Sequence, residues 1–208
     1  MAADATTDLT PLAAAGQACV EGDDGVARCP WASGDPLNVE YHDTEWGVAV
    51  HGESPLLERI TLEAFQSGLS WLTILRKRPD FRRSFAGFDA DVIASFDDDR
   101  VEKLMADASI VRNRAKILAA RTNAAATVAL RAKGGLDELI WSHVPDAAPA
   151  PRTTADVPAK TPGSVRLAKA LKAEGFVFVG PTTAYALMQA VGLVDDHLVG
   201  CHRRGASA

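Results

Sequence analysis

Two cysteines and two histidines have the residue types and spacings of a metal site. His197 and Cys201 are four residues apart, so both side chains can face one point from a single helical turn. Upstream, Cys29 is followed by His42 thirteen residues later. Two thiolates and two imidazoles would complete a tetrahedral zinc site without a position for water, which is the structural kind. The alternative is two buried cysteines and two histidines that find hydrogen-bond partners within the fold.

An acidic residue stands on the apolar face of an expected helix. Ser54 and Pro55, a capping residue and a first-turn proline, predict where this helix begins. Leu56, Ile60 and Glu63 follow the i, i+4, i+7 spacing, which places the Glu63 carboxyl group on the apolar stripe. A buried carboxylate needs an arginine, backbone donors or a ligand, because desolvating its charge is costly. Glu63 is therefore a candidate site residue, and a partner within the fold is the alternative.

Aromatic residues gather in the same part of the sequence. Trp31, Tyr41 and Trp46 precede the helix that carries Glu63, and Trp71 follows it. Flat side chains beside a single acid suit a planar base with N–H edges, because the rings stack on its faces and the carboxylate accepts its hydrogen bonds. The alternative is an ordinary set of core aromatics.

Two glycines bracket a tight turn between two expected helices. Gly175 ends the first helix, and Gly180 precedes the second. The second helix would begin with free backbone N–H groups, and such a helix start favours an anion such as a DNA phosphate. An ordinary packing unit of two helices and a turn is the alternative.

Composition and pattern predict a single, all-α fold. The chain has 208 residues, of which 47% are apolar, enough for one medium core. It has no apolar run long enough to span a membrane, and three cysteines are too few for a disulfide framework, which favours the cytoplasm. Only Phe176–Val179 resembles a strand. Helices are expected over 55–68, 90–96, 99–107, 110–133, 136–144, 165–174 and 181–191.

Charge is distributed unevenly along the chain. The formal net charge is −5, and residues 1–27 carry all of it, so we expect this segment to be a disordered acidic tail. The remainder is neutral but has basic clusters in 76–83 and 109–133. Basic faces on a neutral protein can hold a phosphate backbone, and solvated helix faces are the alternative.

Several sequence blocks resemble, in order, those of the type I DNA-3-methyladenine glycosylase family. The resemblance covers about residues 28–203 and implies an all-α helix-hairpin-helix glycosylase with a second lobe clipped by zinc. It implies one unit over 28–203, a zinc-binding lobe of 28–50 plus 193–203, a helix-hairpin-helix at about 164–192 and a flexible end at 204–208. The blocks are "RCPW", "YHDTEWG", "LEAFQSGLSW", "DASIVRNRAKI", "GFVFVG" and "MQAVGLVDDHLVGC".

The resemblance also assigns roles to residues. Glu63 matches the acid of the base pocket. Asp195 stands where related glycosylases that cleave harder bonds carry an aspartate, so Asp195 is a candidate to stabilise the sugar cation or to orient water. A loop carboxylate beside the zinc site is the alternative for Asp195. The implied zinc ligands are Cys29, His42, His197 and Cys201. The implied substrate-binding residues are Tyr41, Trp71, Trp46 and Asn38, the last where the family usually has an aromatic. The implied DNA-phosphate residues are Gly175, Val177, Gly180, Thr182 and Thr183.

The activity implied is hydrolysis of the N-glycosidic bond of 3-methyladenine in alkylated double-stranded DNA, as in base-excision repair. The enzyme would be a monomer that flips the nucleotide out, sandwiches the cationic base between Tyr41 and Trp71, holds it against an ionised Glu63 and releases free 3-methyladenine. No nucleophilic lysine stands near the hairpin, which favours a monofunctional enzyme. The alternative is a non-catalytic, zinc-stabilised DNA-binding module that senses modified bases.

Overall fold

The computed structural model describes residues 16–146 and 149–206, and helices dominate this part of the chain. The expectation of a predominantly helical fold is confirmed. The elements in chain order are β1 (Val20–Glu21), β2 (Ala27–Arg28), η1 (Pro30–Ala32), α1 (Pro36–Thr44), α2 (Glu53–Gln66), α3 (Trp71–Ser84), η2 (Ala86–Phe88), α4 (Ala90–Ala94), α5 (Asp98–Ala106), α6 (Arg114–Leu130), η3 (Arg131–Lys133), α7 (Gly135–Trp141), η4 (Thr154–Asp156), α8 (Pro162–Ala173) and α9 (Pro181–Ala190).

Three helices begin at clearly different residues from those that the sequence predicted. α6 begins at Arg114 and not at 110, because the Asn113 side chain caps it by accepting from the Lys116 N–H. α2 begins at Glu53 after Gly52, not at Ser54 and Pro55, because the Gly52 N–H donates to the distant Asp137 carboxylate at 2.5 Å and fixes the chain there. α8 begins after Thr161, not after Ser164. The reason is a capping box, in which the Thr161 hydroxyl accepts from the Ser164 N–H and the Ser164 hydroxyl accepts from the Thr161 N–H.

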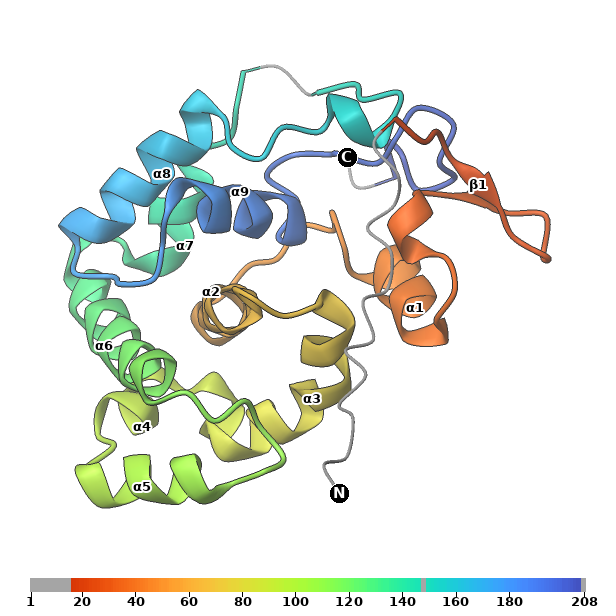
Figure 1. Cartoon of the computed structure of the whole chain (residues 1–208). Helices are drawn as coiled ribbons and strands as arrows, with labels where there is room; N and C mark the ends of the chain where they lie inside the picture. The colour runs from red at the N-terminus through yellow and green to blue at the C-terminus, as the bar shows by residue number, and fades with distance from the viewer. Residues whose placement is uncertain (1–15, 147–148, 207–208) are drawn as a thin grey trace, which may run out of the picture.

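α2 is the helix around which the others pack. Its residues Leu56–Phe65 are all buried, and it contacts α3, α6, α7 and α9. Figure 1 shows α2 in the middle of the molecule, with α9 on one side and α3 on the other. At the α3 end, Phe65 packs edge-on against Phe81 with ring centroids 4.8 Å apart. Because every face of α2 is covered, a polar side chain on it meets other protein groups or an internal cavity.

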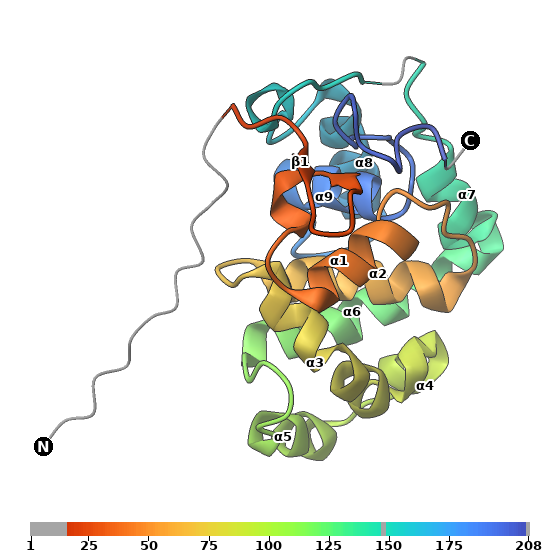
Figure 2. The same ribbon diagram turned by 90° about the vertical axis from the view of Figure 1, so that its right-hand side faces the viewer.

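The N-terminal and C-terminal segments lie side by side. β1 and β2 form an antiparallel hairpin, and the Ala27 carbonyl of β2 accepts from the His202 N–H at 3.0 Å. Figure 2 shows this hairpin beside the C-terminal loop. The hairpin corrects the expectation of a disordered tail over 1–27, because residues 16–27 have a defined backbone, held by long-range hydrogen bonds such as that from the Thr154 N–H to the Gln17 carbonyl. Residues 1–15 lie outside the described part.

The last residues are also more ordered than expected. Arg204 donates to the carbonyl groups of Pro149 and His197, and the Gly205 N–H donates to Asp195 at 2.8 Å. These contacts correct the prediction of a flexible end over 204–208 as far as residue 206. Residues 207–208 are not described.

α8 and α9 pack against each other and are joined by the turn at 174–180. The prediction of a strand over Phe176–Val179 is wrong. Phe178 has a φ of 58°, outside the extended region, and the Val177 backbone pairs with a side chain from α6 instead of a strand. Among the residues with described positions, no helix combines the length and apolar character that crossing a membrane requires.

Candidate functional site

A cavity of about 410 Å³ opens where α1, α2, α3, α9 and the C-terminal loop meet. This volume is in the range of pockets that hold small molecules. Aromatic and acidic side chains share its walls. The lining residues are Cys29, Trp31, Tyr41, Trp46, Glu63, Gln66, Trp71, Thr154, Val157, Ala186, Gln189, Asp196 and Leu198.

Glu63 is the buried acid that the helix periodicity predicted. Glu63 is 6% exposed, and within the described chain its carboxyl group makes no hydrogen bond or ion pair. Burial raises the pKa of Glu63 to about 8, against the opposing effect of the Arg59 charge one turn earlier. In the free protein this pKa favours the protonated carboxyl group at neutral pH, whereas the expected ionised Glu63 concerns the protein with a cationic base bound. A bound cation would draw the proton off.

Arg59 does not neutralise Glu63. Its guanidinium donates to Glu45 at 2.6 Å and lies over the Tyr41 ring, 5.6 Å from the centroid. Glu45 also accepts two hydrogen bonds from Arg78, so the arginine charges are balanced away from the cavity. Glu63 therefore remains available to a ligand.

Four aromatic side chains line the cavity as the sequence suggested. The ring centroids of Tyr41 and Trp71 are 5.2 Å apart at an interplanar angle of 47°, and Trp31 meets Trp46 edge-on at 5.0 Å. A base inserted between two rings would need a centroid separation of roughly 7 Å, twice the contact distance of about 3.5 Å. Tyr41 and Trp71 thus form a corner in this conformation, which corrects the prediction of a sandwich.

Polar atoms of two of these rings are not paired with other protein groups in the described structure. The Tyr41 hydroxyl and the Trp71 Nε1 are buried and have no hydrogen-bond partner among the described residues. Unpaired buried donors cost about 1–3 kcal/mol each, so a group that pairs with them binds favourably. Asn38 is not a lining residue, which corrects its assignment to the substrate site; it lies on α1 with its own Oδ1 buried and unpaired within the described structure.

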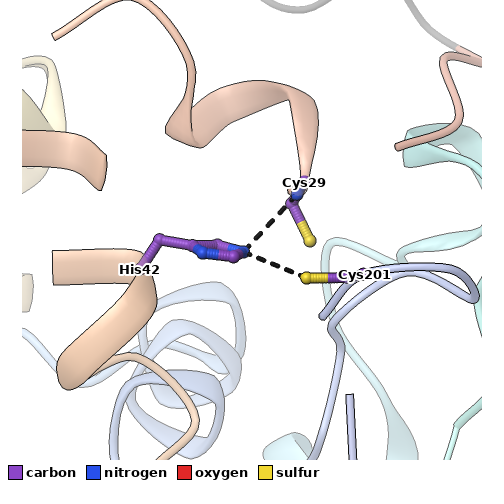
Figure 3. A group of neighbouring side chains, drawn as sticks. All are labelled: Cys29, His42 and Cys201. Carbon is purple, nitrogen blue, oxygen red and sulfur yellow. Dashed lines mark hydrogen bonds between the residues drawn. The ribbon is translucent and has the colours of Figure 1, made fainter. Parts of the chain in front are cut away.

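Three of the four predicted metal ligands come together. The ligand atoms of Cys29, His42 and Cys201 all lie within 4.8 Å of one another, and the three residues come from three separate segments (Figure 3). The Cys201 Sγ and the His42 Nε2 are 3.4 Å apart. His197 is outside this group, but its ring centroid is 5.0 Å from that of His42. It is fully buried, and its Nε2 has no partner in the described part of the chain.

Two aspartates orient the two histidines. Asp43 pairs with the His42 Nδ1 at 2.7 Å, and Asp195 pairs with the His197 Nδ1 at 2.9 Å. A carboxylate on Nδ1 fixes the ring tautomer and leaves Nε2 as the ligand atom, the usual arrangement around zinc-binding histidines. Burial would raise the pKa of Asp195, but hydrogen bonds from the His197 side chain and from backbone N–H groups outweigh it and lower the pKa to about 2.

The same contacts correct the catalytic assignment of Asp195. It does not line the cavity, and both of its carboxylate oxygens accept hydrogen bonds, from His197 and from the Gly205 N–H. The residue that lines the cavity is the next one, Asp196. The loop therefore directs these two neighbouring side chains apart, Asp195 to His197 and Asp196 to the cavity.

The predicted DNA-phosphate residues lie on one turn and the helix start that follows. Gly175 has a φ of 93° and reverses the chain. Gly180 caps α9 without a side-chain hydrogen bond, and Pro181 occupies the first turn. The N–H groups of Thr182 and Thr183 therefore have no helical partner and face outward from the first turn. Val177 is held by Asn123, which donates to its carbonyl at 3.1 Å and accepts from its N–H at 2.8 Å.

Several site residues were not predicted from the sequence, among them Thr154, Val157, Ala186 and Leu198 in the cavity wall. Gln66, Gln189 and Asp196 also line the cavity, and Asn123 holds the turn. Gln66 is one turn after Glu63, a spacing that could have identified it. Asp196 lies in a loop without periodicity, and only the structure shows which neighbouring aspartate faces inward.

Comparison with known proteins bears on this fold and site. Residues 31–204 match the family described as methyladenine glycosylase. Over 178 residues the chain is 45% identical to DNA-3-methyladenine glycosylase 1 of Escherichia coli (strain K12), covering 84% of this chain and 95% of that protein. A crystal structure of 3-methyladenine DNA glycosylase I matches with a TM-score of 0.82 at 43% identity, covering 85% of this chain and 99% of that one. Another, a variant enzyme in complex with 3-methyladenine, matches with a TM-score of 0.80 at 29% identity, covering 85% and 97%.

The fold and the cavity define a helical protein with a buried acid in an aromatic cavity of small-molecule size. The chain belongs to the methyladenine glycosylase family. This confirms the resemblance on which the sequence analysis relied.

Proposed function

We propose that this protein is a monofunctional DNA glycosylase that excises 3-methyladenine from alkylated double-stranded DNA in base-excision repair. The names of its relatives support this activity, as does the bound 3-methyladenine in one matching structure. We further propose that the protein acts as a monomer in the cytoplasm.

The observation that carries the proposal is an unpaired, buried carboxyl group in an aromatic cavity. A base methylated at N3 is a cation while it is attached to deoxyribose, and it is therefore already a good leaving group. Its charge would stabilise the carboxylate form of Glu63, and its N–H edge would donate to that carboxylate. Tyr41 and Trp71 would add a cation–π contribution of about 1–2 kcal/mol. Neutral adenine lacks the charge, so Glu63 would stay protonated and would bind adenine only weakly.

The turn between α8 and α9 supports binding to the DNA backbone. The N–H groups of Thr182 and Thr183 lie at the positive end of the α9 dipole, where a phosphate oxygen is favoured. The turn between Gly175 and Gly180 allows a DNA strand to approach the protein backbone closely. We propose that 164–192 acts as a helix-hairpin-helix and anchors the strand while the nucleotide is flipped into the cavity.

We also propose that Cys29, His42, His197 and Cys201 hold a structural zinc ion. Two features support it: the convergence of three ligand atoms, and the buried, unpaired His197 Nε2 beside them within the described structure. Zinc would supply bonds that tie the N-terminal segment to the C-terminal loop. Asp43 and Asp195 keep the imidazole rings oriented. Four protein ligands leave no position for water, so the site serves stability and takes no part in hydrolysis.

The direct test is incubation of the protein with methylated DNA, followed by identification of the released base by mass spectrometry. Release of 3-methyladenine supports the proposal. Binding of the DNA without release of any base would instead support the non-catalytic DNA-binding module. Glu63, Tyr41 and Trp71 line one open cavity, and this arrangement favours the enzyme, whereas a blocked pocket would have favoured the module.

A further inference from the structure

Part of the cavity wall comes from a long connection and not from the helices that carry Glu63 and Trp71. Thr154 in η4 and Val157 directly after it line the cavity, and both lie in the connection 142–161 between α7 and α8. Connections of this length are uncommon in compact folds, and many of them belong to binding sites. Such a connection needs contacts with other segments if it is to hold a cavity wall in one position.

The N-terminal segment supplies contacts of this kind. The Thr154 N–H donates to the Gln17 carbonyl at 2.9 Å, and the Thr154 hydroxyl oxygen accepts from the N–H groups of Gly16 and Gln17 at 3.1 and 3.3 Å. Figures 1 and 2 both show the start of the red N-terminal segment beside the teal loop that contains η4. All three hydrogen bonds use the backbone of residues 16–17, so they depend on the path of the chain and not on the Gln17 side chain.

The same segment also contacts the other loop that contributes to the wall. Leu198 lines the cavity from the loop after α9, and the Cys19 Sγ lies 3.9 Å from the Leu198 carbonyl oxygen and 3.8 Å from that of Val199. The Val199 N–H donates to the Pro151 carbonyl at 2.7 Å, shortly before η4. Residues 16–19 therefore contact both loops of the wall, and the two loops bind each other.

We propose that residues 16–19 are a positioning segment, which holds Thr154 and Val157 against the base in the cavity and thereby raises the affinity for it. This role depends on the proposed glycosylase function, because the ligand is the methylated base. Residues 16–19 lie outside the part of the chain that matches the family, which is 31–204. The role is therefore a property of this chain and does not follow from membership of the family.

The physical reason is that a flat base is held tightly only when every wall stays in contact with it. A gap of about 0.5–1 Å already forfeits roughly a quarter to a half of a van der Waals contact. Glu63 and Trp71 are positioned by α2 and α3, whereas Thr154 and Val157 are half-buried residues of a connection. The hydrogen bonds to residues 16–17 order this connection in the free protein, so less conformational entropy is lost when the base binds.

Gln17→Pro tests the proposal, with Gln17→Ala as the matched control. Proline removes the N–H group that donates to Thr154, whereas alanine removes only the side chain and keeps both backbone groups. We expect Gln17→Pro to bind free 3-methyladenine about fivefold to tenfold more weakly in calorimetric titration, the effect of about one lost hydrogen bond. The Thr154 amide hydrogen should exchange with solvent at least tenfold faster. The single-turnover excision rate at saturating enzyme should stay within twofold of the parent, and Gln17→Ala should match the parent throughout.

A base affinity of Gln17→Pro within twofold of the parent would overturn the proposal, as would a loss of affinity without faster exchange of the Thr154 amide. If Gln17→Pro does not fold, Thr154→Val decides, with Thr154→Ser as its control, because valine removes the acceptor hydroxyl and serine keeps it. Weaker base binding together with faster exchange of the Val157 amide then supports the role, and either result without the other contradicts it.

Failure of the proposed function gives a different outcome. A parent protein that neither binds nor releases 3-methyladenine would refute the glycosylase function, and with it the role of residues 16–19. An active parent whose Gln17→Pro variant binds the base equally well would refute the role of residues 16–19 alone.

Discussion

Replacing Glu63 by Gln should change the pH dependence of stability. The pKa of Glu63 is about 8 in the folded protein, against an ordinary value of 4.5. Between these two values the folded protein retains a proton that the unfolded chain releases, so the free energy of unfolding falls as pH rises. Each pH unit in that window costs about 1.4 kcal/mol, which gives about 3 kcal/mol at pH 7 and about 5 kcal/mol above pH 8. Glutamine does not titrate and removes this dependence.

Urea denaturation of parent and Glu63→Gln from pH 5 to pH 9 measures the effect. Burial of the glutamine amide changes the free energy of unfolding of Glu63→Gln by an amount that does not depend on pH. The quantity to compare is therefore how the difference in free energy of unfolding between the two proteins changes with pH. We expect the difference to grow in favour of Glu63→Gln by several kcal/mol between pH 5 and pH 8. Glu40→Gln, an exposed glutamate on α1, is the matched control and should follow the parent. Parallel curves for Glu63→Gln and the parent would refute the reasoning that Glu63 is an unpaired, buried acid.

Three further predictions concern the base, the DNA and the metal. Because Glu63 must lose a proton to hold a cation, kcat/KM for 3-methyladenine excision should rise about tenfold per pH unit up to about pH 8 and then level off; a flat profile from pH 6 to pH 9 contradicts this. Asn123→Leu should weaken DNA binding by tenfold or more in fluorescence anisotropy, because Val177 loses both backbone partners, while the affinity for free base is kept; equal DNA affinity would exclude the turn from the interface. Chelation of zinc should lower the melting temperature of the parent by several degrees, and the metal-free His197→Ala should show a melting temperature lowered by an equal amount. A parent protein that is purified without bound zinc and is stable without it would refute the metal site.

The sequence predicted the presence of helices better than their ends. Hydrophobic spacing placed Glu63 on the buried face of α2, because periodicity directly reflects which face is covered. The start of α2 was misplaced because a tertiary contact competes with the local cap, and the start of α8 was misplaced because two local caps, Thr161 and Ser164, compete. Asp137 fixes Gly52 from a distant helix, and Thr161 lies closer to the first turn than Ser164.

The site was predicted where helix geometry or a known motif constrains it, and missed in the loops. The positions of the four aromatic residues before and after α2 in the sequence predicted that they share one site. The angles between their rings could not be predicted, because these depend on how α1 and α3 pack. Asp195 and Asp196 are identical in type and adjacent in sequence. Only the backbone of the loop after α9 determines that Asp195 contacts His197 and that Asp196 lines the cavity.

The measurement that tests the central claim most directly compares two ligands of the same shape. A permanently cationic N-methylated purine and its neutral isostere are titrated into the parent and into Glu63→Gln at pH 8.5, above the pKa of Glu63. We predict that the parent binds the cation at least 30-fold more tightly than the neutral ligand, and that Glu63→Gln keeps only the smaller preference that the Tyr41 and Trp71 rings provide. A preference of equal size in both proteins would contradict the account, because the charge of the ligand would then be recognised by some other group.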